Sequence, residues 1–456
     1  MGSEKFDLVV IGSGPGGMRA AIQAAKAGKR VAIVDKSRAG GGCVFFGTVP
    51  SKSLREAALE NRPDWRASIA RMREVVDAES KVVARQLERN GVRFFRGTAR
   101  FTSPFEVTVG SERLSAPSFV IATGTSPIRR PEFALKGAPV YDSDSILQLK
   151  TRPKKMLIVG AGVIGCEYAS IFSRLGVKVT LVDRRLELLR AVDHEAVEAL
   201  GAEFRASGIE LKLGAELGPL ARKKNSRTEL EVSVSGKKWS GDCVLVCLGR
   251  EPNTSDLGLP AIGVELDGRG QIKVDPATYA TSLSHIYAVG DVIGPPALAA
   301  AAAEQGRIAV SGLLGISGGT FPAAFPSGIY TIPEISSFGV LENELREKHV
   351  PYVVGRANFR ELARGLITGA ENGFIKLIVH RESRQILGVH AIGLGASELI
   401  HIGQIVHALG APVEFLVQNI FNYPTFAEAY KVAALNALNQ IRNHPISEAP
   451  QNTIHP

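Results

Sequence analysis

Two glycine-rich turns carry the residues with the clearest chemical potential in this sequence. They read Gly12-Ser-Gly14-Pro-Gly-Gly17 and Gly160-Ala-Gly162-Val163-Ile164-Gly165. In this spacing the first glycine permits a tight turn, the second lets the backbone approach a pyrophosphate, and the third lets a helix pack closely on a strand. The amino terminus of such a helix also attracts negatively charged phosphates. Each turn is therefore a candidate site for the phosphates of a dinucleotide.

An acidic residue follows each turn at the position that a dinucleotide-binding unit requires. The first turn lies between a strand pattern at 7–11 and a helix pattern at 18–27, and the next strand ends at Asp35. The second turn has the same surroundings, and its second strand ends at Asp183. A lone glycine motif is weak because glycines also mark ordinary turns, but this repeated context favours a phosphate site. A carboxylate at the strand end suits hydrogen bonds to ribose hydroxyls.

The elements that must position these residues predict an α/β protein of several domains. A chain of 456 residues is too long for one hydrophobic core. The two repeated units predict two Rossmann-like dinucleotide-binding domains. From about residue 330 the pattern changes to strands at 374–379 and 386–392, followed by helices at 397–409 and 426–441. This region predicts a C-terminal α+β domain, whose polar end from Asn443 is expected to fray.

Several connecting segments also have recognisable patterns. They are amphipathic helices within 51–91, a strand-like stretch at 92–109, an apolar strand at 119–124, a strand at 242–249 and an alanine-rich helix from about Ala297. Cys243 and Cys247 are expected to share the buried face of one strand as small core residues.

Composition excludes several other classes of protein. The net charge is +9, but Lys and Arg are spread along the chain without a long basic run, so nucleic acid is not an expected partner. We see no export signal and no apolar run long enough for a membrane span. The four cysteines form no Cys-x-x-Cys pair and no metal-type cluster, which predicts a reducing, cytoplasmic location and no metal site.

The sequence resembles the two-dinucleotide flavoprotein disulfide reductases over nearly its whole length, and most closely the pyridine nucleotide transhydrogenase branch of that family. The motifs that carry the resemblance occur in order along the chain. They are Gly12 to Gly17, Gly41-Gly-Cys43, Gly47-Thr-Val-Pro-Ser-Lys52, Ala122-Thr-Gly124, Gly160 to Glu167, Tyr287-Ala-Val-Gly-Asp291, Tyr330-Thr-Ile-Pro-Glu-Ile and Asn422-Tyr-Pro-Thr-Phe-Ala-Glu428.

The resemblance implies that the first unit binds FAD. In this assignment Asp35 accepts hydrogen bonds from the adenosine ribose, and Asp291 holds the ribityl chain; outside its motif, Asp291 would be interpreted as a turn or cap residue. The implied FAD residues are Gly12, Gly14, Gly17, Asp35, Lys36, Gly42, Cys43, Thr48, Lys52, Thr123, Gly124, Asp291 and Ala297. The implied domains are FAD-binding at 1–150 and 281–328, NAD(P)-binding at 151–280 and a dimerisation domain at 329–456.

Two further residues are implied to tune the flavin. Lys52 resembles the lysine beside the flavin N5, and Glu167 resembles the carboxylate paired with it. Without the motifs, both would be interpreted as solvated helix charges. The amino terminus of the helix from Ala297 is a candidate to favour negative charge on the reduced ring.

The sequence departs from the disulfide reductases at both halves of their dithiol apparatus. Those enzymes have a second cysteine five residues after the one at Cys43, and here that position is Thr48. Where they place a basic histidine, this chain has Tyr423, although Glu428 still follows. A phenol is a poor base for a thiol at neutral pH, and a hydroxyl forms no disulfide. Cys43 is therefore expected to be a packing residue beside the flavin rather than a redox partner.

The second unit carries signals for both nicotinamide nucleotides. Asp183 favours NAD, since an acid repels a 2′-phosphate. Arg184 and Arg190 match positions where NADP-using relatives carry phosphate-binding arginines, and guanidinium groups suit phosphate. The implied NAD(P) residues are Gly160, Gly162, Val163, Ile164, Gly165, Glu167, Asp183, Arg184, Arg190 and Gly249.

Together these features predict an enzyme that passes hydride between NADPH/NADP and NADH/NAD through FAD, as a cytoplasmic homodimer. A flavin oxidoreductase that reduces a disulfide, a quinone or oxygen is one alternative. A non-catalytic flavoprotein that only binds nucleotides is another.

Overall fold

The computed structural model describes residues 3–60, 64–224, 226 and 229–443. The chain forms two compact units, the first made of residues 1–185 and 212–322 and the second of residues 186–211 and 323–456. The predicted frayed end lies, from residue 444 onward, outside the described residues.

A five-stranded parallel sheet lies at the centre of the first unit. In sheet order its strands are β19 (Ile286–Ala288), β8 (Phe119–Ile121), β2 (Leu8–Ile11), β3 (Val31–Asp35) and β4 (Arg93–Arg96). Strand β2 is wholly buried, which explains its continuous apolar sequence. Asp35 is the last residue of β3, as the sequence pattern predicts.

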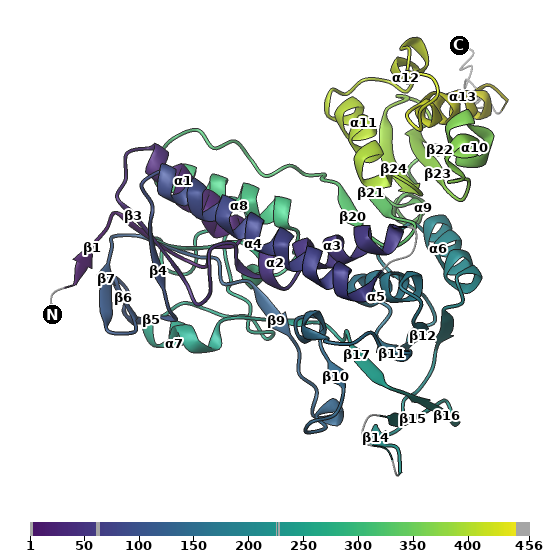
Figure 1. The fold of residues 1–456 in the computed structure, drawn as a ribbon. Coiled ribbons are helices and arrows are strands. Elements are labelled where there is room, and N and C mark those ends of the chain that lie inside the picture. The colour runs from purple at the N-terminus through teal and green to yellow at the C-terminus, as the bar shows by residue number, and fades with distance from the viewer. Residues whose placement is uncertain (1–2, 61–63, 225, 227–228, 444–456) are drawn as a thin grey trace, which may run out of the picture. The chain divides into compact units, whose positions relative to one another are not determined.

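Helices cover one face of this sheet and a small mixed sheet, antiparallel except for the β1–β7 pair, covers the other. Leu8 and Val10 share a core with α1 (Pro15–Lys26), α4 (Trp65–Arg89) and α8 (Ala299–Leu313). Val9 and Ile11 point to the opposite face, as successive residues of a strand must. There they pack with the sheet β1 (Glu4–Lys5), β7 (Glu112–Ser115), β6 (Glu106–Val109) and β5 (Ala99–Ser103). Figure 1 shows α1 and α8 running side by side over the strands.

A second sheet of five strands completes the first unit. Its order is β10 (Val140–Tyr141), β17 (Cys243–Val246), β11 (Lys155–Val159), β12 (Lys178–Asp183) and β13 (Glu210–Leu213). Strand β11 pairs in parallel with both β12 and β17, and α5 (Val163–Arg174) follows β11 through the second glycine turn. Its core is shared with a three-stranded sheet, β14 (Ala221–Arg222), β15 (Leu230–Val234) and β16 (Lys237–Gly241).

Short elements connect these two sheets. Strands β9 (Thr125–Pro127) and β18 (Arg250–Pro252) pair antiparallel. The remaining helices of the first unit are α2 (Gly41–Phe45), α3 (Thr48–Leu59), α7 (Leu259–Ile262) and the 3-10 turns η1 (Pro131–Phe133), η2 (Ser145–Gln148), η3 (Ser255–Leu257) and η4 (Gly290–Ile293).

The second unit is built on an antiparallel sheet. Its order is β20 (Ser327–Ile329), β21 (Ile335–Gly339), β24 (Ile386–Ile392), β23 (Phe374–His380) and β22 (Tyr352–Asn358). Its helices are α6 (His194–Ala206), α9 (Glu342–Glu347), α10 (Ala363–Thr368), α11 (Ala396–Ala408), α12 (Glu414–Gln418), α13 (Glu428–Asn443) and the turn η5 (Phe359–Glu361). The α+β pattern expected after residue 330 is therefore present.

Several element boundaries differ from the sequence prediction, for example those of the first helix, which spans Pro15–Lys26, and of β8, which ends at Ile121. The strand-like stretch at 92–109 divides into β4, β5 and β6, because turns interrupt it. Helix α8 begins at Ala299, and Ala297 before it has a φ of 50°, outside the helical range. Cys247 lies beyond the end of β17, so it does not share a strand face with Cys243. Helix α13 begins two residues later than predicted, at Glu428.

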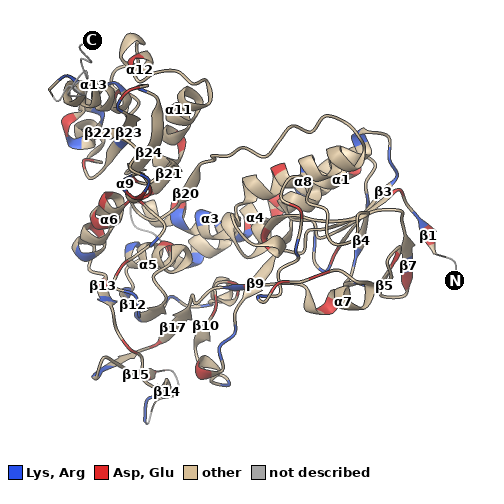
Figure 2. Ribbon diagram, turned by 180° about the vertical axis from the view of Figure 1, so that it is seen from behind, with Lys and Arg blue, Asp and Glu red and all other residues tan. Residues whose placement is uncertain are grey.

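Three surface and composition features concern the described residues as a whole: the distribution of charge, the presence of a membrane-spanning helix and the presence of a metal-binding cluster. Figure 2 shows Lys and Arg scattered over the elements of each unit, interleaved with Asp and Glu. Among the helices that the structure describes, none is both long and apolar enough to cross a bilayer. Within the same described ranges, no group of three or more His, Cys, Asp and Glu side chains is placed to hold a metal ion.

Candidate functional site

Both glycine turns have backbone geometry that a side chain would block. Gly12 has a φ of +104°, and a Cβ there would lie 2.2 Å from the carbonyl oxygen of Ala122. Gly160 has a φ of +105°, and its Cβ would lie 2.4 Å from the carbonyl oxygen of Cys247. Each turn therefore passes against the chain that leaves a neighbouring strand, at the carboxyl edge of its parallel sheet, where α/β proteins bind ligands.

The helix amino termini after these turns are open toward a ligand. Among the described residues, neither α1 nor α5 has a side chain that caps its first turn. An ideal Cβ at Gly14 or at Gly162 would have no neighbouring atom within 4 Å. The first amides of a helix lack intrahelical partners and carry partial positive charge. Both turns therefore fit a pyrophosphate, as the dinucleotide interpretation requires.

The segment around Gly41 lies directly against the first turn. The Gly40 amide donates to Ser13 Oγ at 3.0 Å, and a Cβ at Gly41 would lie 2.7 Å from the backbone of Gly14. Gly42 is exposed, and nothing lies within 4 Å of its ideal Cβ. The structure thus brings together two motifs whose contacting residues, Ser13 and Gly40, are 27 positions apart in the sequence.

Both carboxylate oxygens of Asp35 accept hydrogen bonds within the protein, from the first glycine turn and from the loop after β3. One oxygen accepts from the Ser13 amide at 2.8 Å and from Ser13 Oγ at 2.7 Å. The other oxygen accepts from the amide and the hydroxyl of Ser37, both at 2.9 Å. Four acceptances fill the usual capacity of a carboxylate. Asp35 therefore shapes the phosphate turn, and its ribose contact stays a prediction that would require the Ser37 hydroxyl to turn away. Lys36 beside it is exposed.

Thr123 and Gly124 leave β8 beside the first turn and are fixed by Asn253, a residue that the sequence analysis missed. The Thr123 hydroxyl donates to the Asn253 carbonyl at 2.9 Å, the Asn253 amide side chain donates to the Thr123 carbonyl at 2.8 Å, and the Asn253 backbone amide donates to the Gly124 carbonyl at 3.0 Å. Asp291 lies in η4 and accepts from the hydroxyl of Thr125 at 3.3 Å. These residues share the carboxyl edge of the first sheet.

Lys52 and Glu167 form the predicted ion pair. The ammonium of Lys52 donates to both oxygens of Glu167, at 2.9 and 2.7 Å. Lys52 belongs to α3 and Glu167 to α5, so the pair joins the helix after the Cys43 segment to the helix after the second glycine turn. The Glu167 side chain is 6 % exposed and that of Lys52 is 23 % exposed, so neither is a solvated helix charge. The contact between these two residues confirms that they form one pair.

Cys43 has the properties of a protonated thiol. It lies in α2 and is half-buried, and Thr48 begins the next helix, α3. Burial raises the pKa of the Cys43 thiol above its ordinary value, and the ammonium of Lys52 and a hydrogen bond with Thr48 only partly oppose this rise. The thiolate is the reactive form of cysteine. A lone thiol with a raised pKa is a poor participant in disulfide exchange.

Asp183 ends β12 and is held by Arg185, which the sequence analysis did not single out. The Arg185 guanidinium donates from Nε to Oδ1 at 3.1 Å and from Nη2 to Oδ2 at 2.7 Å. The backbone amides of Ala161 and Arg185 also donate to the carboxylate. Burial by itself would raise the pKa of Asp183, but the hydrogen bonds from Arg185 and Ala161 outweigh it and lower that pKa. Arg184, in the same unit, is exposed.

Arg250 is a second residue that the sequence analysis missed, directly after Gly249. Its guanidinium donates to the hydroxyl of Thr125 at 2.9 Å, to the carbonyl of Thr125 at 2.8 Å, and to Asp144 at 3.2 Å. Since the Thr125 hydroxyl in turn donates to Asp291, a continuous polar chain joins Arg250 to Asp291. The two predicted nucleotide sites are thus connected through Thr125.

The other predicted residues lie as follows. Val163 is exposed and Ile164 half-buried in the first turn of α5, while Ala297 is exposed just before α8. Arg190 is exposed and belongs to the second unit. Tyr423 is 74 % exposed in the second unit, and Glu428 there begins α13.

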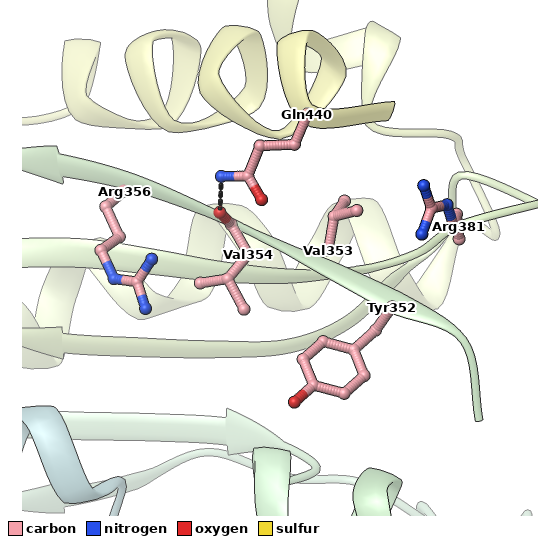
Figure 3. Close-up of a pocket in the computed structure, with 6 residues that line it drawn as sticks. All are labelled: Tyr352, Val353, Val354, Arg356, Arg381 and Gln440. Atoms are coloured by element: carbon pink, nitrogen blue, oxygen red, sulfur yellow. Dashed lines mark hydrogen bonds between the residues drawn. The ribbon is translucent and has the colours of Figure 1, made fainter. Parts of the chain in front are cut away.

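A separate hollow of about 400 Å³ lies in the second unit and contains no predicted site residue. Its lining side chains come from β22, α13 and Arg381 (Figure 3). Gln440 donates to the carbonyl of Val354 at 2.6 Å, and Arg356 and Tyr352 are engaged by Glu195 and Glu342. These polar groups are already occupied within the chain, so the hollow offers them to no ligand.

Comparison with protein families matches almost the whole chain. Residues 6–306 match the pyridine nucleotide-disulphide oxidoreductase family, and residues 325–434 match the dimerisation domain of the same family. The exposed apolar side chains of the second unit, such as Ile405, Leu409 and Ile420, lie within the latter match.

Individual proteins give the same result. The chain is 44% identical over 465 residues to the soluble pyridine nucleotide transhydrogenase of Vibrio vulnificus strain YJ016, covering 96% of this chain and 98% of that protein. It is also 44% identical over 466 residues to the protein of that name from Yersinia pestis strain Pestoides F, with the same coverage. Among solved structures, the HOCl-induced flavoprotein disulfide reductase RclA from Escherichia coli is similar, with a TM-score of 0.89, 26% identity and coverage of 95% of this chain and 99% of that chain. LpdA from Mycobacterium tuberculosis is similar with a TM-score of 0.87, 26% identity and the same coverage.

Proposed function

Because the chain belongs to the pyridine nucleotide-disulphide oxidoreductase family, we propose that it is an FAD-dependent transhydrogenase that exchanges hydride between NADPH/NADP and NADH/NAD. The observation that carries this proposal is the pair Cys43 and Thr48. The hydroxyl of Thr48 stands where a dithiol enzyme needs its second sulfur, and the thiol at the other position, Cys43, has a raised pKa. Electrons therefore have no disulfide route out of the protein.

The first unit supplies the residues that would hold FAD. The uncapped amides at the start of α1 and the exposed Gly42 would bind the pyrophosphate, and Asp291 at the sheet edge would bind a hydroxylated chain. When bound, FAD accepts and releases hydride, which is chemistry that no side chain of the protein provides. The task of the protein is to orient the two reactants and to exclude competing reactions.

Lys52 would supply positive charge beside the bound cofactor. Glu167 holds the ammonium through two hydrogen bonds, which fixes its position and satisfies two of its three donors. A fixed ammonium stabilises negative charge as it develops nearby, without reorganising at the moment of reaction. Because Glu167 lies in the helix that begins at the second glycine turn, the same pair links cofactor tuning to the nicotinamide nucleotide site.

The pairing of Asp183 with Arg185 supports the use of both NADPH and NADH. A bare carboxylate at the end of β12 would repel the 2′-phosphate of NADPH. Arg185 cancels that charge, and Arg184 and Arg190 add positive groups close in sequence. One site could then accept NADPH and NADH in turn, as a transhydrogenase must. The bound nucleotide leaves before the other enters.

The alternative functions differ in the acceptor. RclA is described as a disulfide reductase, but Thr48 and Tyr423 argue against that activity here. Reduction of a quinone or of oxygen uses the same first half-reaction and is distinguished only by assay. We also propose that the protein acts in the cytoplasm as a homodimer. The name of its relatives and the match to the dimerisation domain support this.

Stopped-flow spectroscopy of the FAD-loaded protein tests the proposed function. Anaerobic NADPH should bleach the flavin absorbance, and a thio-NAD analogue should then restore it while the absorbance of the reduced analogue appears. The same reduced protein mixed with oxidised lipoamide or glutathione serves as the comparison and should stay bleached. Recovery with a disulfide or a quinone, but not with the NAD analogue, would overturn the proposal.

A further inference from the structure

Lys376 is a buried cation that the proposed reaction does not use. It lies in β23 of the second unit, and its side chain is 1 % exposed. Its ammonium donates to Asp193 at 2.8 Å and to Glu195 at 2.7 Å, and it also contacts the carboxylate of Glu342. A buried ammonium is tolerated only where it is paired and hydrogen-bonded. These contacts therefore fix the chain around Asp193 against strand β23.

A second cation strengthens the same attachment. Arg356 of β22 donates from Nε and Nη2 to the two oxygens of Glu195, at 2.7 and 2.6 Å. Together, the hydrogen bonds from Arg356 and those from Lys376 outweigh burial and lower the pKa of Glu195 to about 2. Glu195 is therefore ionised at any physiological pH, and its bonds to both cations persist.

The acids bound in this way belong to one short segment of the chain. Asp193 and Glu195 lie at the start of α6, within residues 186–211, which group with the second unit although they follow directly on Arg185. The two carboxylate oxygens of Asp193 have different partners. One oxygen caps α6 by accepting from the Ala196 amide at 3.3 Å, and the other accepts from Lys376. The cap and the anchor are thus the same side chain.

Arg190 lies immediately before this anchored point. It stands three positions before Asp193, which is at most about 10 Å of chain. Leu188 and Leu189 before it are buried at 3 and 4 % exposure, whereas Arg190 itself is exposed. The Val192 amide donates to the Leu189 carbonyl at 2.9 Å, which closes a turn around Arg190. Arg190 is therefore held from both sides, with its side chain toward solvent.

We propose that Lys376 is a positioning residue for recognition of the adenosine 2′-phosphate, acting through Asp193 on the loop that carries Arg190. The proposal rests on the proposed function, since it assumes that Arg190 meets the nucleotide. It assigns the 2′-phosphate, and not the nicotinamide or the flavin, as the group whose binding depends on Lys376. A bidentate or ion-pair contact to phosphate is sensitive to placement, because guanidinium donors have a fixed direction.

Two variants separate positioning from simple stability. Asp193→Asn keeps a good helix cap, because Asn and Asp are equivalent there, but it weakens the bond to Lys376. Lys376→Met removes every bond that Lys376 makes, leaves only the Arg356–Glu195 bonds of the attachment, and is the stronger but less stable variant. Glu414→Gln is the matched control, since it removes an ion pair with Arg384 elsewhere in the second unit.

The measurement is isothermal titration of the full FAD-loaded protein with 2′,5′-ADP and, separately, with ADP. We expect Asp193→Asn to raise the dissociation constant of 2′,5′-ADP by about 5- to 20-fold while that of ADP changes less than about twofold. Lys376→Met should show a larger change in the same ratio, and Glu414→Gln should show none. A role limited to stability would lower the melting temperature without changing the ratio.

The possible outcomes are distinct. An unchanged ratio in Asp193→Asn, or wild-type protein that binds 2′,5′-ADP no better than ADP, would overturn the assignment of Lys376. If Lys376→Met fails to fold, Asp193→Asn decides the question alone. Stopped-flow transfer from NADPH to thio-NAD in the wild type is scored separately, so its absence contradicts the proposed function while the titration still decides whether Lys376 positions the loop.

Discussion

The guanidinium of Arg185 covers the carboxylate of Asp183 with two hydrogen bonds, from Nε at 3.1 Å and from Nη2 at 2.7 Å. The acid that ends the second nucleotide-binding strand is therefore not a bare negative charge. In a Rossmann domain such an acid selects NAD by repelling a 2′-phosphate. Here the guanidinium two positions later pairs with that acid, so we expect it to offset much of the repulsion, and this relationship gives a direct test of nucleotide selection.

Arg185→Gln should restore discrimination against NADPH. Without its partner, Asp183 faces the nucleotide with its full charge, so the KM for NADPH should rise by roughly 10-fold, and that for NADH should stay the same or fall. Steady-state kinetics with each nucleotide measures this. Arg100→Gln, which removes an exposed arginine of β5, is the control. An equal change for both nucleotides would contradict the neutralising role.

Glu167→Gln should slow reduction of the flavin while leaving nucleotide binding nearly intact. The amide cannot hold the Lys52 ammonium as the carboxylate does, because one of the two acceptors is replaced by a donor. We expect the rate of flavin bleaching by NADPH to fall about 10- to 100-fold. Single-turnover stopped-flow measures it, and Glu56→Gln on the exposed side of α3 is the matched control. An unchanged rate would show that the pair only joins two helices.

Local patterns predicted the backbone of this site better than its side-chain pairs. Both glycine turns and both strand-end acids are in place because each depends on a motif within one segment. The Lys52–Glu167 pair joins residues 115 positions apart and was predicted only through the family resemblance. Asn253 and Arg250 could not be found in this way. Their partners Thr123 and Thr125 lie more than a hundred residues away, and pairings at that distance leave no periodic signal in a single sequence.

Two other features were beyond the sequence for different reasons. Whether Arg185 turns toward Asp183 or toward a ligand is decided by its rotamer, which the sequence does not record. The sequence around Lys376 is apolar and typical of a buried strand. A lysine in such a strand would ordinarily be predicted to lie at an exposed edge. Only the fold brings Asp193 and Glu195 to it, and residues 186–211 were expected to belong with the nucleotide-binding segment before them.

Thr48→Cys should give the protein a second acceptor of electrons. The new sulfur would stand at the five-residue spacing from Cys43 that the dithiol enzymes use, and a disulfide between it and Cys43 would accept one further electron pair. Anaerobic titration with NADPH should then require two equivalents per FAD for full reduction instead of one. Thr48→Ser keeps the hydroxyl and should behave as the wild type. If the wild type itself takes up two equivalents, the single-route interpretation is wrong.

Acid should weaken the second unit through Glu195. The pKa of this carboxylate is lowered from 4.5 to about 2, first by the hydrogen bonds from Arg356 and then by those from Lys376, against an opposing effect of burial. A carboxyl group whose folded pKa lies below its unfolded pKa stabilises the folded state above the unfolded value. That contribution is lost as the pH falls from about 4.5 toward 2. In Glu195→Gln this contribution is absent at every pH. The measurement is the difference in urea midpoint between wild type and variant, followed by circular dichroism. This difference should be constant above about pH 5 and shrink steadily below about pH 4.5. A difference that persists undiminished to pH 3 would mean that the pairs with Arg356 and Lys376 do not stabilise the ionised form.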